Sequence, residues 1–544
     1  MEFTTIRTTP YTDQQPGTAG LRKTVAVFRQ PHYLENFVQA VFDCVPTLRG
    51  GRLVVGGDGR YWNFEAIQIL LCIAAANGVA SIALARGGVL STPAASILMR
   101  NEDAAGGFIL TASHNPAGPD GDFGIKFNTA GGGQASARLT EAITERTRAI
   151  DRYLIATGVP EIDLDRPSAS FIGDMRIDSV DAVAQYADKM ETLFDFDAIR
   201  DAVKDGMCVR FDAMNAVTGP YASEILVRRL GLPELTVMRG TPREDFGGRH
   251  ADPNPHEAHE LRSLAYGEHP PDLLAASDGD GDRNMILGPH TIVSPCDSLA
   301  VLAANATRVP GYRDGLVAVA RSMPTSHAID RVAAKLGIPC VETPSGWRYF
   351  ASLLEAGRIS LCGEESFGTS SNHCREKDGL WAVLFWLNLL AVTGRSVPEL
   401  LAAHWAEYGR TFFLRHDFRI PDAAAAQAVI AGLRDALPDL VGRQLAGRTV
   451  VAADDFAYDD PVDGMRSERQ GLRLILESDA RIVFRLSGTD TAGATLRVYI
   501  EDHTDDPARF NEDAMVALAP FAEAARDLAR ITQLTGLESP TSMV

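Results

Sequence analysis

A serine follows directly on an apolar run in the sequence GFILTASHNP. The run GFILTA is typical of a strand buried on both faces, which would bring Ser113 and His114 to the edge of a sheet. A hydroxyl beside an imidazole is suited to nucleophilic catalysis, although most loop serines only close turns or cap helices. No GxSxG sequence surrounds Ser113, so acyl transfer is poorly supported.

Three carboxylates alternate with glycines in the sequence SDGDGDRN. Asp278, Asp280 and Asp282 offer hard oxygen ligands at a spacing that suits a divalent cation. An EF-hand loop would need glycine and glutamate where this chain has Arg283 and Pro289, so that class of site is excluded. A solvated acidic turn is the remaining alternative, but the apolar run DLLAAS before the loop disfavours it. We expect Mg²⁺, which takes few protein carboxylates and completes its shell with phosphate or water.

A serine near such a metal loop indicates a phosphoryl carrier. Phosphoryl transfer depends mostly on positioning and on the neutralisation of charge. Mg²⁺, Lys126 and Arg283 are suited to that neutralisation. His114 would act as an acid or base, or as a structural partner of the serine loop.

Two further segments suit a phosphorylated sugar. In CGEESFG, Glu364 and Ser366 can hydrogen-bond sugar hydroxyls. In RLSGTDTAGATLR, a Ser-Gly-Thr turn between Arg485 and Arg497 offers backbone N–H groups, hydroxyls and two guanidinium groups to an anion. The same segment is also consistent with an ordinary β-hairpin. Together, the four segments indicate an enzyme that acts on a phosphosugar.

Composition limits the partners of the chain. A formal net charge of -19 over 544 residues argues against nucleic acid or an anionic membrane as a partner. Seven scattered cysteines without a CxxC pair favour a reducing, cytoplasmic location over a disulfide scaffold. The N-terminus has no apolar core typical of a signal peptide. The most apolar stretch, 380–392, is shorter than the roughly 20 residues of a membrane span and predicts a buried helix.

Short apolar runs alternate with helical patterns along most of the chain, which predicts stacked α/β units. The serine, metal and sugar segments each follow such a run, where open α/β sheets place ligands at the carboxyl ends of their strands. The last part reads differently: several strand patterns precede an Ala-rich helix expected from about 507 to 534. It predicts a separate α+β domain with its own antiparallel sheet. The runs are 52–57, 81–85, 107–112, 207–213, 272–277, 316–320 and 358–363, and the helical patterns include 64–78, 140–150 and 221–231.

The sequences TASHNP, DGDGDR, GEESFG and RLSGT…GATLR resemble, in kind and order, the four signature loops of the α-D-phosphohexomutases. PGTAGLRKTV, FGGRHADPNP and ESFGTSSNHCREKDGLWAVL resemble further loops of the glucose-specific type in that family, the phosphoglucomutases. The resemblance extends from residue 16 to residue 501. GEESFG is the discriminating element, because mannose- and glucosamine-type relatives tend to carry Gly-Glu-Met/Gln-Ser-Gly-His there.

The resemblance implies an α/β fold with four domains around a central cleft. Three would be similar mixed α/β sandwich domains, and a C-terminal α+β domain would close on the substrate phosphate. The expected ranges are 1–190 with the phosphoserine loop, 191–291 with the metal loop, 292–408 with the sugar loop and 409–544 with the phosphate-binding loop.

The resemblance also implies a reaction, the reversible interconversion of α-D-glucose 1-phosphate and glucose 6-phosphate. Phosphorylated Ser113 would be the donor, and glucose 1,6-bisphosphate the intermediate and activator. Mg²⁺ would be held by Asp278, Asp280, Asp282 and an oxygen of the phosphoserine. Because the two phosphates exchange places, one non-reacting phosphate site would serve both orientations of the sugar. The type it resembles is commonly monomeric.

Individual residues match the motifs of the family. Arg348 stands where such loops often carry lysine, and Asp490, next to the phosphate turn, is expected to point away from it. The residues implied near the transferring phosphate are Ser113, His114, Lys126, Arg22 and Lys377. The residues implied to bind substrate are Arg283, Thr343, Gly346, Glu364, Ser366, Arg375, Arg485, Ser487, Gly488, Thr489 and Arg497.

Three alternatives remain open at this point. A mutase with another hexose preference would act on mannose 1-phosphate as well as on glucose 1-phosphate. A phosphosugar-binding relative would bind the bisphosphate without turnover. A metal-dependent phosphatase using Ser113 would release inorganic phosphate as its main product.

Overall fold

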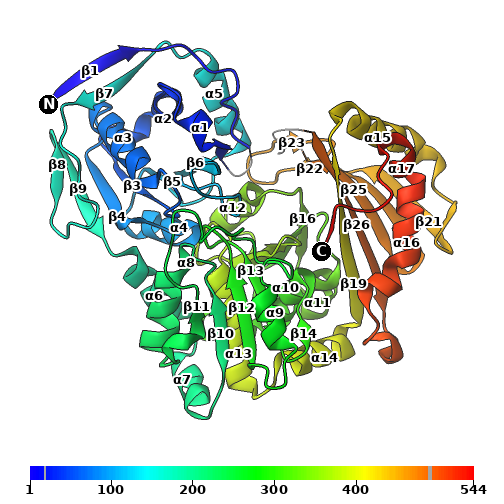
Figure 1. The fold of residues 1–544 in the computed structure, drawn as a ribbon. Helices are drawn as coiled ribbons and strands as arrows, with labels where there is room; N and C mark the ends of the chain where they lie inside the picture. The colour runs from blue at the N-terminus through cyan, green and yellow to red at the C-terminus, as the bar shows by residue number, and fades with distance from the viewer. Residues whose placement is uncertain (18–19, 488–492) are drawn as a thin grey trace. The chain divides into compact units, whose positions relative to one another are not determined.

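The computed structural model describes residues 1–17, 20–487 and 493–544. These form two compact units, each built from three separate stretches of chain. The first unit holds residues 1–293, 305–317 and 346–398, and the second holds 294–304, 318–345 and 399–544. Figure 1 shows the ribbon coloured along the chain.

The first unit contains a seven-stranded mixed sheet. β3 lies between β4 and β5 and is parallel to both, as the apolar run 52–57 predicts. β9 is parallel to β4 as well, and antiparallel strands lie outside this group, β6 beside β5 and β8 beside β9. β1 (Glu2–Arg7) pairs separately with β7 (Arg152–Thr157). In order across the sheet the strands are β2 (Leu21–Thr24), β6 (Asp122–Thr129), β5 (Gly106–Leu110), β3 (Arg52–Gly57), β4 (Ser81–Val89), β9 (Met175–Val180) and β8 (Ser170–Ile172).

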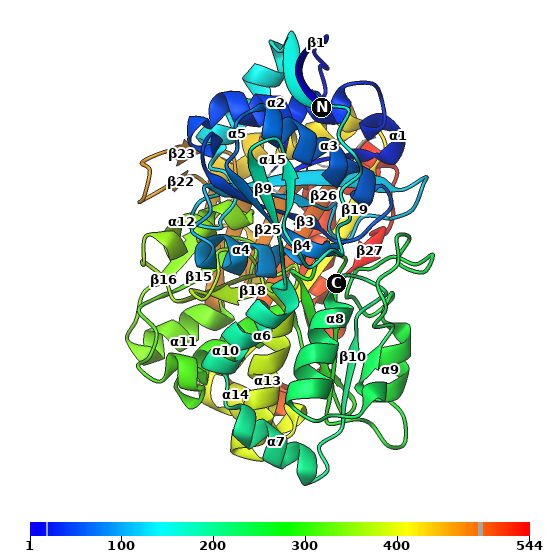
Figure 2. The ribbon, with the colours of Figure 1, turned by 90° about the vertical axis from the view of Figure 1, so that its left-hand side faces the viewer.

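Helices cover both faces of this sheet. Figures 1 and 2 show α2 and α3 on one side and α4 on the other. The apolar side chains of α2 and α3, with those of β3 and β5, form one continuous buried core. The helices of this part are α1 (Val25–Phe28), α2 (Tyr33–Cys44), α3 (Asn63–Ala76), α4 (Thr92–Asn101) and α5 (Ala137–Arg148).

A second sheet of the first unit carries the metal segment. Its strands are β11 (Val237–Met238), β10 (Val209–Asp212), β12 (Leu273–Ser277), β13 (Asn284–Gly288) and β14 (Thr291–Ile292), in that order. β10 is parallel to β11 and β12, whereas β12 and β13 are antiparallel neighbours joined by the Asp-Gly loop. The helices are α6 (Ala182–Leu193), α7 (Phe196–Lys204), α8 (Thr218–Ala222) and α9 (His259–Ala265). The helical segment expected over 221–231 is confirmed through Arg229, although α8 ends at Ala222 and the segment continues as a π-helix, Ser223–Arg229.

The sugar segment lies on a hairpin of the first unit, β17 (Leu361–Glu364) and β18 (Gly368–Ser371), preceded by α12 (Trp347–Glu355). After it, the apolar stretch 380–392 forms the buried helix that was expected, α13 (Gly379–Thr393). The Asp378 side chain caps its first turn, and Gly394, with φ of 64°, ends it. Among the described residues no single helix is long and apolar enough to cross a membrane. α13 and α14 (Val397–Tyr408) meet those criteria only jointly, as a pair bent by 85°.

The second unit contains α10 (Pro295–Ala304), α11 (Ala328–Leu336) and the parallel strands β15 (Val319–Ser322) and β16 (Cys340–Thr343). It also holds a seven-stranded C-terminal sheet, the antiparallel sheet that was expected for the α+β part of the chain. The strands are β20 (Gln444–Leu445), β21 (Arg448–Asp455), β24 (Leu472–Leu476), β25 (Arg481–Ser487), β26 (Ala494–Thr504), β19 (Arg410–Ile420) and β27 (Ser542–Met543); a small ribbon, β22 (Tyr458–Asp459) and β23 (Arg466–Ser467), stands apart.

The helix expected from about 507 to 534 is wrong as a single element. A 3₁₀ turn, Pro507–Arg509, precedes α16 (Ala514–Leu528), whose first turn is capped by Asp513. Arg530 then adopts a left-handed conformation and separates α16 from α17 (Ile531–Thr535). These helices pack with α15 (Ala423–Ala436) on the apolar side chains of the C-terminal sheet.

Candidate active site

Ser113 lies three residues beyond the carboxyl end of β5, in a constrained backbone. Its φ is 53°, in the left-handed region that non-glycine residues seldom adopt. The Ser113 N–H donates to Thr111 Oγ1 at 2.8 Å, and the Ser113 hydroxyl donates to Asp278 Oδ2 at 2.9 Å. The side chain is 1% exposed. The serine is therefore held in one orientation against the metal segment.

A buried ion pair, Arg60 with Asp58, supports the loop that carries Ser113. Arg60 bonds Asp58 through Nε at 2.9 Å, and a second guanidinium nitrogen donates to the Ser113 carbonyl at 2.6 Å. Asp58 also accepts the hydroxyl of Thr111, and Arg60 donates to the Asp122 carbonyl at 2.9 Å. Sequence reasoning missed this pair, although its segment, DGRYW, follows the carboxyl end of β3. The pair fixes the backbone on both sides of Ser113.

We expect Arg60→Met to lower the free energy of unfolding by about 3–5 kcal/mol, because it leaves the Asp58 carboxylate buried without its partner. The double variant Asp58→Asn/Arg60→Met should lose less, since no unpaired charge remains. Arg86→Met is the control: its pair with Asp181 is about half exposed and should contribute under about 1 kcal/mol. Denaturant unfolding measures all three, and a double variant less stable than Arg60→Met would contradict the expectation.

The Asp-Gly loop between β12 and β13 gathers its three carboxylates in a buried cluster. Ligand oxygens of Asp278, Asp280 and Asp282 all lie within 4.8 Å of one another. Asp278 Oδ1 accepts the N–H groups of Asp282 and Arg283 at 2.9 and 3.0 Å, which closes the loop. Gly279 is required here, because a Cβ would lie 2.3 Å from the Ser113 carbonyl oxygen. The glycines of the motif thus let the loop approach the serine.

The donor set fits a hard divalent cation. Among the described residues, nothing donates a hydrogen bond to Asp280 Oδ1 or Asp282 Oδ1, although both atoms are buried. A buried carboxylate oxygen without a partner is costly, and a cation would remove that cost. All the donors are oxygens, which suits Mg²⁺ or a similar ion better than a soft metal.

Two lysines flank the carboxylates. Lys126 Nζ lies 2.6 Å from Asp280 Oδ2, and Lys377 Nζ lies 3.2 Å from Asp282 Oδ2. Burial disfavours ionisation of Asp280, but the Lys126 ammonium and the Thr92 hydroxyl outweigh it and hold the pKa of Asp280 well below its usual range. Burial and the other two carboxylates raise the pKa of Asp278. Thr92, which sequence reasoning also missed, donates to Asp280 at 2.7 Å.

His114 and Arg22 lie beside the cluster. Burial and the charge of Arg283 lower the pKa of His114 well below its usual value, so the imidazole is neutral at physiological pH. No described residue hydrogen-bonds His114 Nδ1. Arg283 itself pairs with Asp252 at 3.0 Å. A guanidinium nitrogen of Arg22 donates to Asn115 Oδ1 at 3.4 Å. This contact holds the positive charge of Arg22 beside the loop that carries Ser113.

The residues expected to bind the sugar differ in burial and in their hydrogen-bond partners. Glu364 ends β17, and its Oε1 accepts the Gly346 N–H at 3.0 Å. Burial raises the pKa of the Glu364 carboxyl. Ser366 lies in the turn after Glu364 and is partly exposed. Arg375, by contrast, is engaged by Glu355 and by the carbonyls of its own loop.

The residues expected to bind the phosphate belong to the second unit where the structure describes them. Arg485 and Arg497 are directly opposed on the antiparallel strands β25 and β26. This pairing is compatible with an ordinary β-hairpin and with a phosphate site alike. Opposed like charges repel, and a bound anion would relieve that repulsion. Ser487 ends β25, while Gly488, Thr489 and Asp490 lie outside the described residues. Thr343 also belongs to this unit, at the end of β16.

Family models match nearly the whole chain. Three are described as phosphoglucomutase/phosphomannomutase alpha/beta/alpha domains I, II and III, over residues 13–154, 184–291 and 295–408. A fourth, described as the phosphoglucomutase-1 C-terminal domain, matches residues 410–541. The chain therefore has three α/β/α domains followed by a distinct C-terminal domain.

Full-length relatives agree with these models. The chain is 51% identical over 537 residues to a phosphoglucomutase of Rhizobium radiobacter, covering 99% of both chains. It is 46% identical over 564 residues to human phosphoglucomutase-1, again with 99% of both chains covered. Among solved structures, the Paramecium phosphoglucomutase parafusin in its open form matches with a TM-score of 0.92 and 41% identity, covering 100% of this chain and 99% of that one. The chain belongs to the phosphoglucomutase/phosphomannomutase family, and within it to the phosphoglucomutases.

Proposed function

We propose that the chain catalyses the reversible interconversion of α-D-glucose 1-phosphate and glucose 6-phosphate. The observation that carries this is the 2.9 Å hydrogen bond from the Ser113 hydroxyl to Asp278 in a buried carboxylate cluster. A phosphoserine at that position would face the cation ligands and two ammonium groups. The names of the full-length relatives supply the hexose, and the GEESFG loop agrees with them.

In the proposed reaction, Ser113 carries the phosphoryl group. The bond from phosphorus to Ser113 Oγ breaks as the bond to O6 of glucose 1-phosphate forms, and the O6 proton leaves to a base. Ser113 Oγ takes up a proton as the phosphoryl group leaves, and the resulting glucose 1,6-bisphosphate then reorients. Its O1–phosphorus bond breaks as the bond from phosphorus to Ser113 Oγ forms again, the serine hydroxyl gives up its proton, and O1 takes up one to give glucose 6-phosphate. Lys126 and Lys377 neutralise charge on the transferring group. When bound at Asp278, Asp280 and Asp282, Mg²⁺ supplies further charge neutralisation there.

The rest of the substrate would be held by the remaining residues expected from the sequence. Glu364 and Ser366 are proposed to bond sugar hydroxyls. Arg485, Ser487, Gly488, Thr489 and Arg497 are proposed to hold the phosphate that does not react, in both orientations. The domain boundaries, the common cleft, the monomeric state and the cytoplasmic location stay predictions.

The assay that tests this function uses glucose 1-phosphate, MgCl₂ and a trace of glucose 1,6-bisphosphate, with product detected by glucose-6-phosphate dehydrogenase. We expect turnover that requires both the metal and the bisphosphate. Mannose 1-phosphate used as readily as glucose 1-phosphate would support a broader hexose preference. Inorganic phosphate as the main product would support a phosphatase, and tight bisphosphate binding without turnover would support a binding protein.

A further inference from the structure

The loop between β18 and α13 holds a buried carboxylate next to one of the two site lysines. Glu376 precedes Lys377 in this loop, and its side chain is 0% exposed. Its Oε1 accepts a hydrogen bond from Asn128 Nδ2 at 2.8 Å, and its Oε2 accepts one from Gln134 Nε2 at 2.9 Å. Both carboxylate oxygens are therefore tied to a distant part of the chain.

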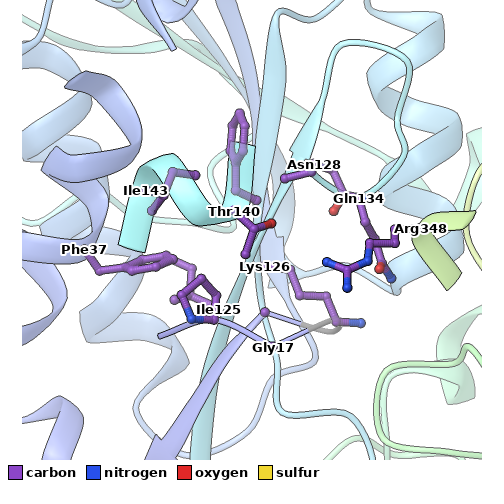
Figure 3. A pocket seen from close by; sticks show the side chains of 13 residues that line it. Gly17, Phe37, Ile125, Lys126, Asn128, Gln134, Thr140, Ile143 and Arg348 are labelled. Carbon is purple, nitrogen blue, oxygen red and sulfur yellow. The ribbon is translucent and has the colours of Figure 1, made fainter. Parts of the chain in front are cut away.

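That distant part carries the other site lysine. Asn128 lies two residues after Lys126 on β6, so the two side chains leave the same face of the strand. Figure 3 shows Lys126, Asn128 and Gln134 lining one pocket. Glu376 thus joins the strand of Lys126 to the loop of Lys377, whose ammonium groups contact Asp280 and Asp282.

Keeping a carboxylate at this position is costly. Burial raises the pKa of Glu376 to about 7, even though Lys126 and the Asn128 and Gln134 amides favour its charged form. An apolar or amide side chain would avoid the desolvation of a charge. A glutamate, however, presents a separate acceptor oxygen to each of the two amide donors, whereas a glutamine presents one acceptor oxygen and one NH₂ group.

We propose that Glu376 is a positioning residue, which fixes the 372–378 loop against β6 and so sets the separation of the Lys126 and Lys377 ammonium groups. The role rests on the proposed function, because both lysines are taken to face the transferring phosphoryl group. Neighbouring contacts agree with a fixed loop: Cys374 Sγ donates to the Glu376 carbonyl at 3.0 Å. At Gly368, a Cβ would lie 2.3 Å from Lys377 Cδ, so the path of that side chain is also restricted.

Glu376→Gln tests the proposal by placing an NH₂ group against one of the two amide donors. We expect kcat to fall about 10- to 100-fold, the range for a misplacement of about 1 Å, with KM changed less than about twofold. The reciprocal variant Glu376→Gln/Gln134→Glu restores one acceptor for each donor and should recover kcat to within about threefold of wild type. Glu355→Gln is the matched control. Glu355 also binds this loop, through Arg375, but its side chain is exposed and it does not join the loop to β6.

Steady-state kinetics of the four proteins decide the matter. An unchanged kcat in Glu376→Gln overturns the positioning role, and so does a loss that the reciprocal variant leaves unrepaired. If Glu376→Gln does not fold, Glu376→Asp keeps both acceptors on a shorter arm, and the proposal then requires a lower kcat at constant KM. An inactive wild-type chain would contradict the proposed function, whereas an active wild type with a fully active Glu376→Gln contradicts only this inference.

Discussion

Ser113→Ala should abolish turnover of glucose 1-phosphate, lowering kcat by roughly 10⁴-fold or more, as expected when the group that forms a covalent intermediate is removed. The hydroxyl is the only part lost, and its single described contact is the bond to Asp278. Labelled glucose 1,6-bisphosphate should transfer phosphate to the wild-type chain and not to the variant. The coupled assay measures the loss of turnover, and the labelling measures the loss of phosphate transfer to the chain.

The controls follow from the environment of the serine. Ser360→Ala removes another buried hydroxyl, one that accepts the Val317 N–H at 2.9 Å, and should leave activity unchanged. Ser113→Gly should be as inactive as Ser113→Ala. Its free energy of unfolding should be about 1 kcal/mol higher than that of Ser113→Ala, because the φ of 53° at this position favours glycine. Wild-type-like turnover in either Ser113 variant would remove this residue as the carrier.

Asp282→Asn should produce the second large loss, because it removes a charged ligand from the carboxylate cluster. We expect activity to fall by at least about 10²-fold, as when a preorganised charge at a reaction centre is removed. Saturating MgCl₂ should also stabilise only the wild type, by about 2.7 kcal/mol at 100 times its Kd. Differential scanning calorimetry of the metal-free protein with and without MgCl₂ gives the second readout independently of activity.

Asp181→Asn is the control for that substitution. Asp181 caps α6 from an exposed position, and asparagine caps a helix about equally well. It should therefore keep both the activity and the response to MgCl₂. A full MgCl₂ response in Asp282→Asn would show that the cation is held elsewhere.

The parts of the site that were predictable lie at the ends of apolar runs. The sequence DLLAAS predicts a buried strand, and the structure ends β12 there, directly before the Asp-Gly loop. β5 likewise lies in the apolar run before the serine segment and ends three residues before Ser113. A strand pattern and the polar residues after it are local signals, so they can be read without knowledge of the rest of the fold.

The supporting residues were not predictable in this way. Arg60 reaches the Ser113 carbonyl across 53 positions, and Glu376 reaches Asn128 across 248. Nothing in either local sequence distinguishes these side chains from other charged loop residues. The break at Arg530 was missed for another reason: it uses a left-handed arginine, where glycine or proline would have given a signal.

The route of the chain through its two compact units bears on how the protein is made. All three stretches of the first unit end by Pro398, so that unit can form while the ribosome is still working. The stretches 294–304 and 318–345 belong to the second unit, and most of that unit, 399–544, emerges later. The apolar helix α10 and the amphipathic helix α11 lie in these two stretches and must wait for those residues. A nascent chain stopped shortly after Pro398 would therefore expose apolar side chains of 294–304 and 318–345, to which chaperones bind and through which chains aggregate.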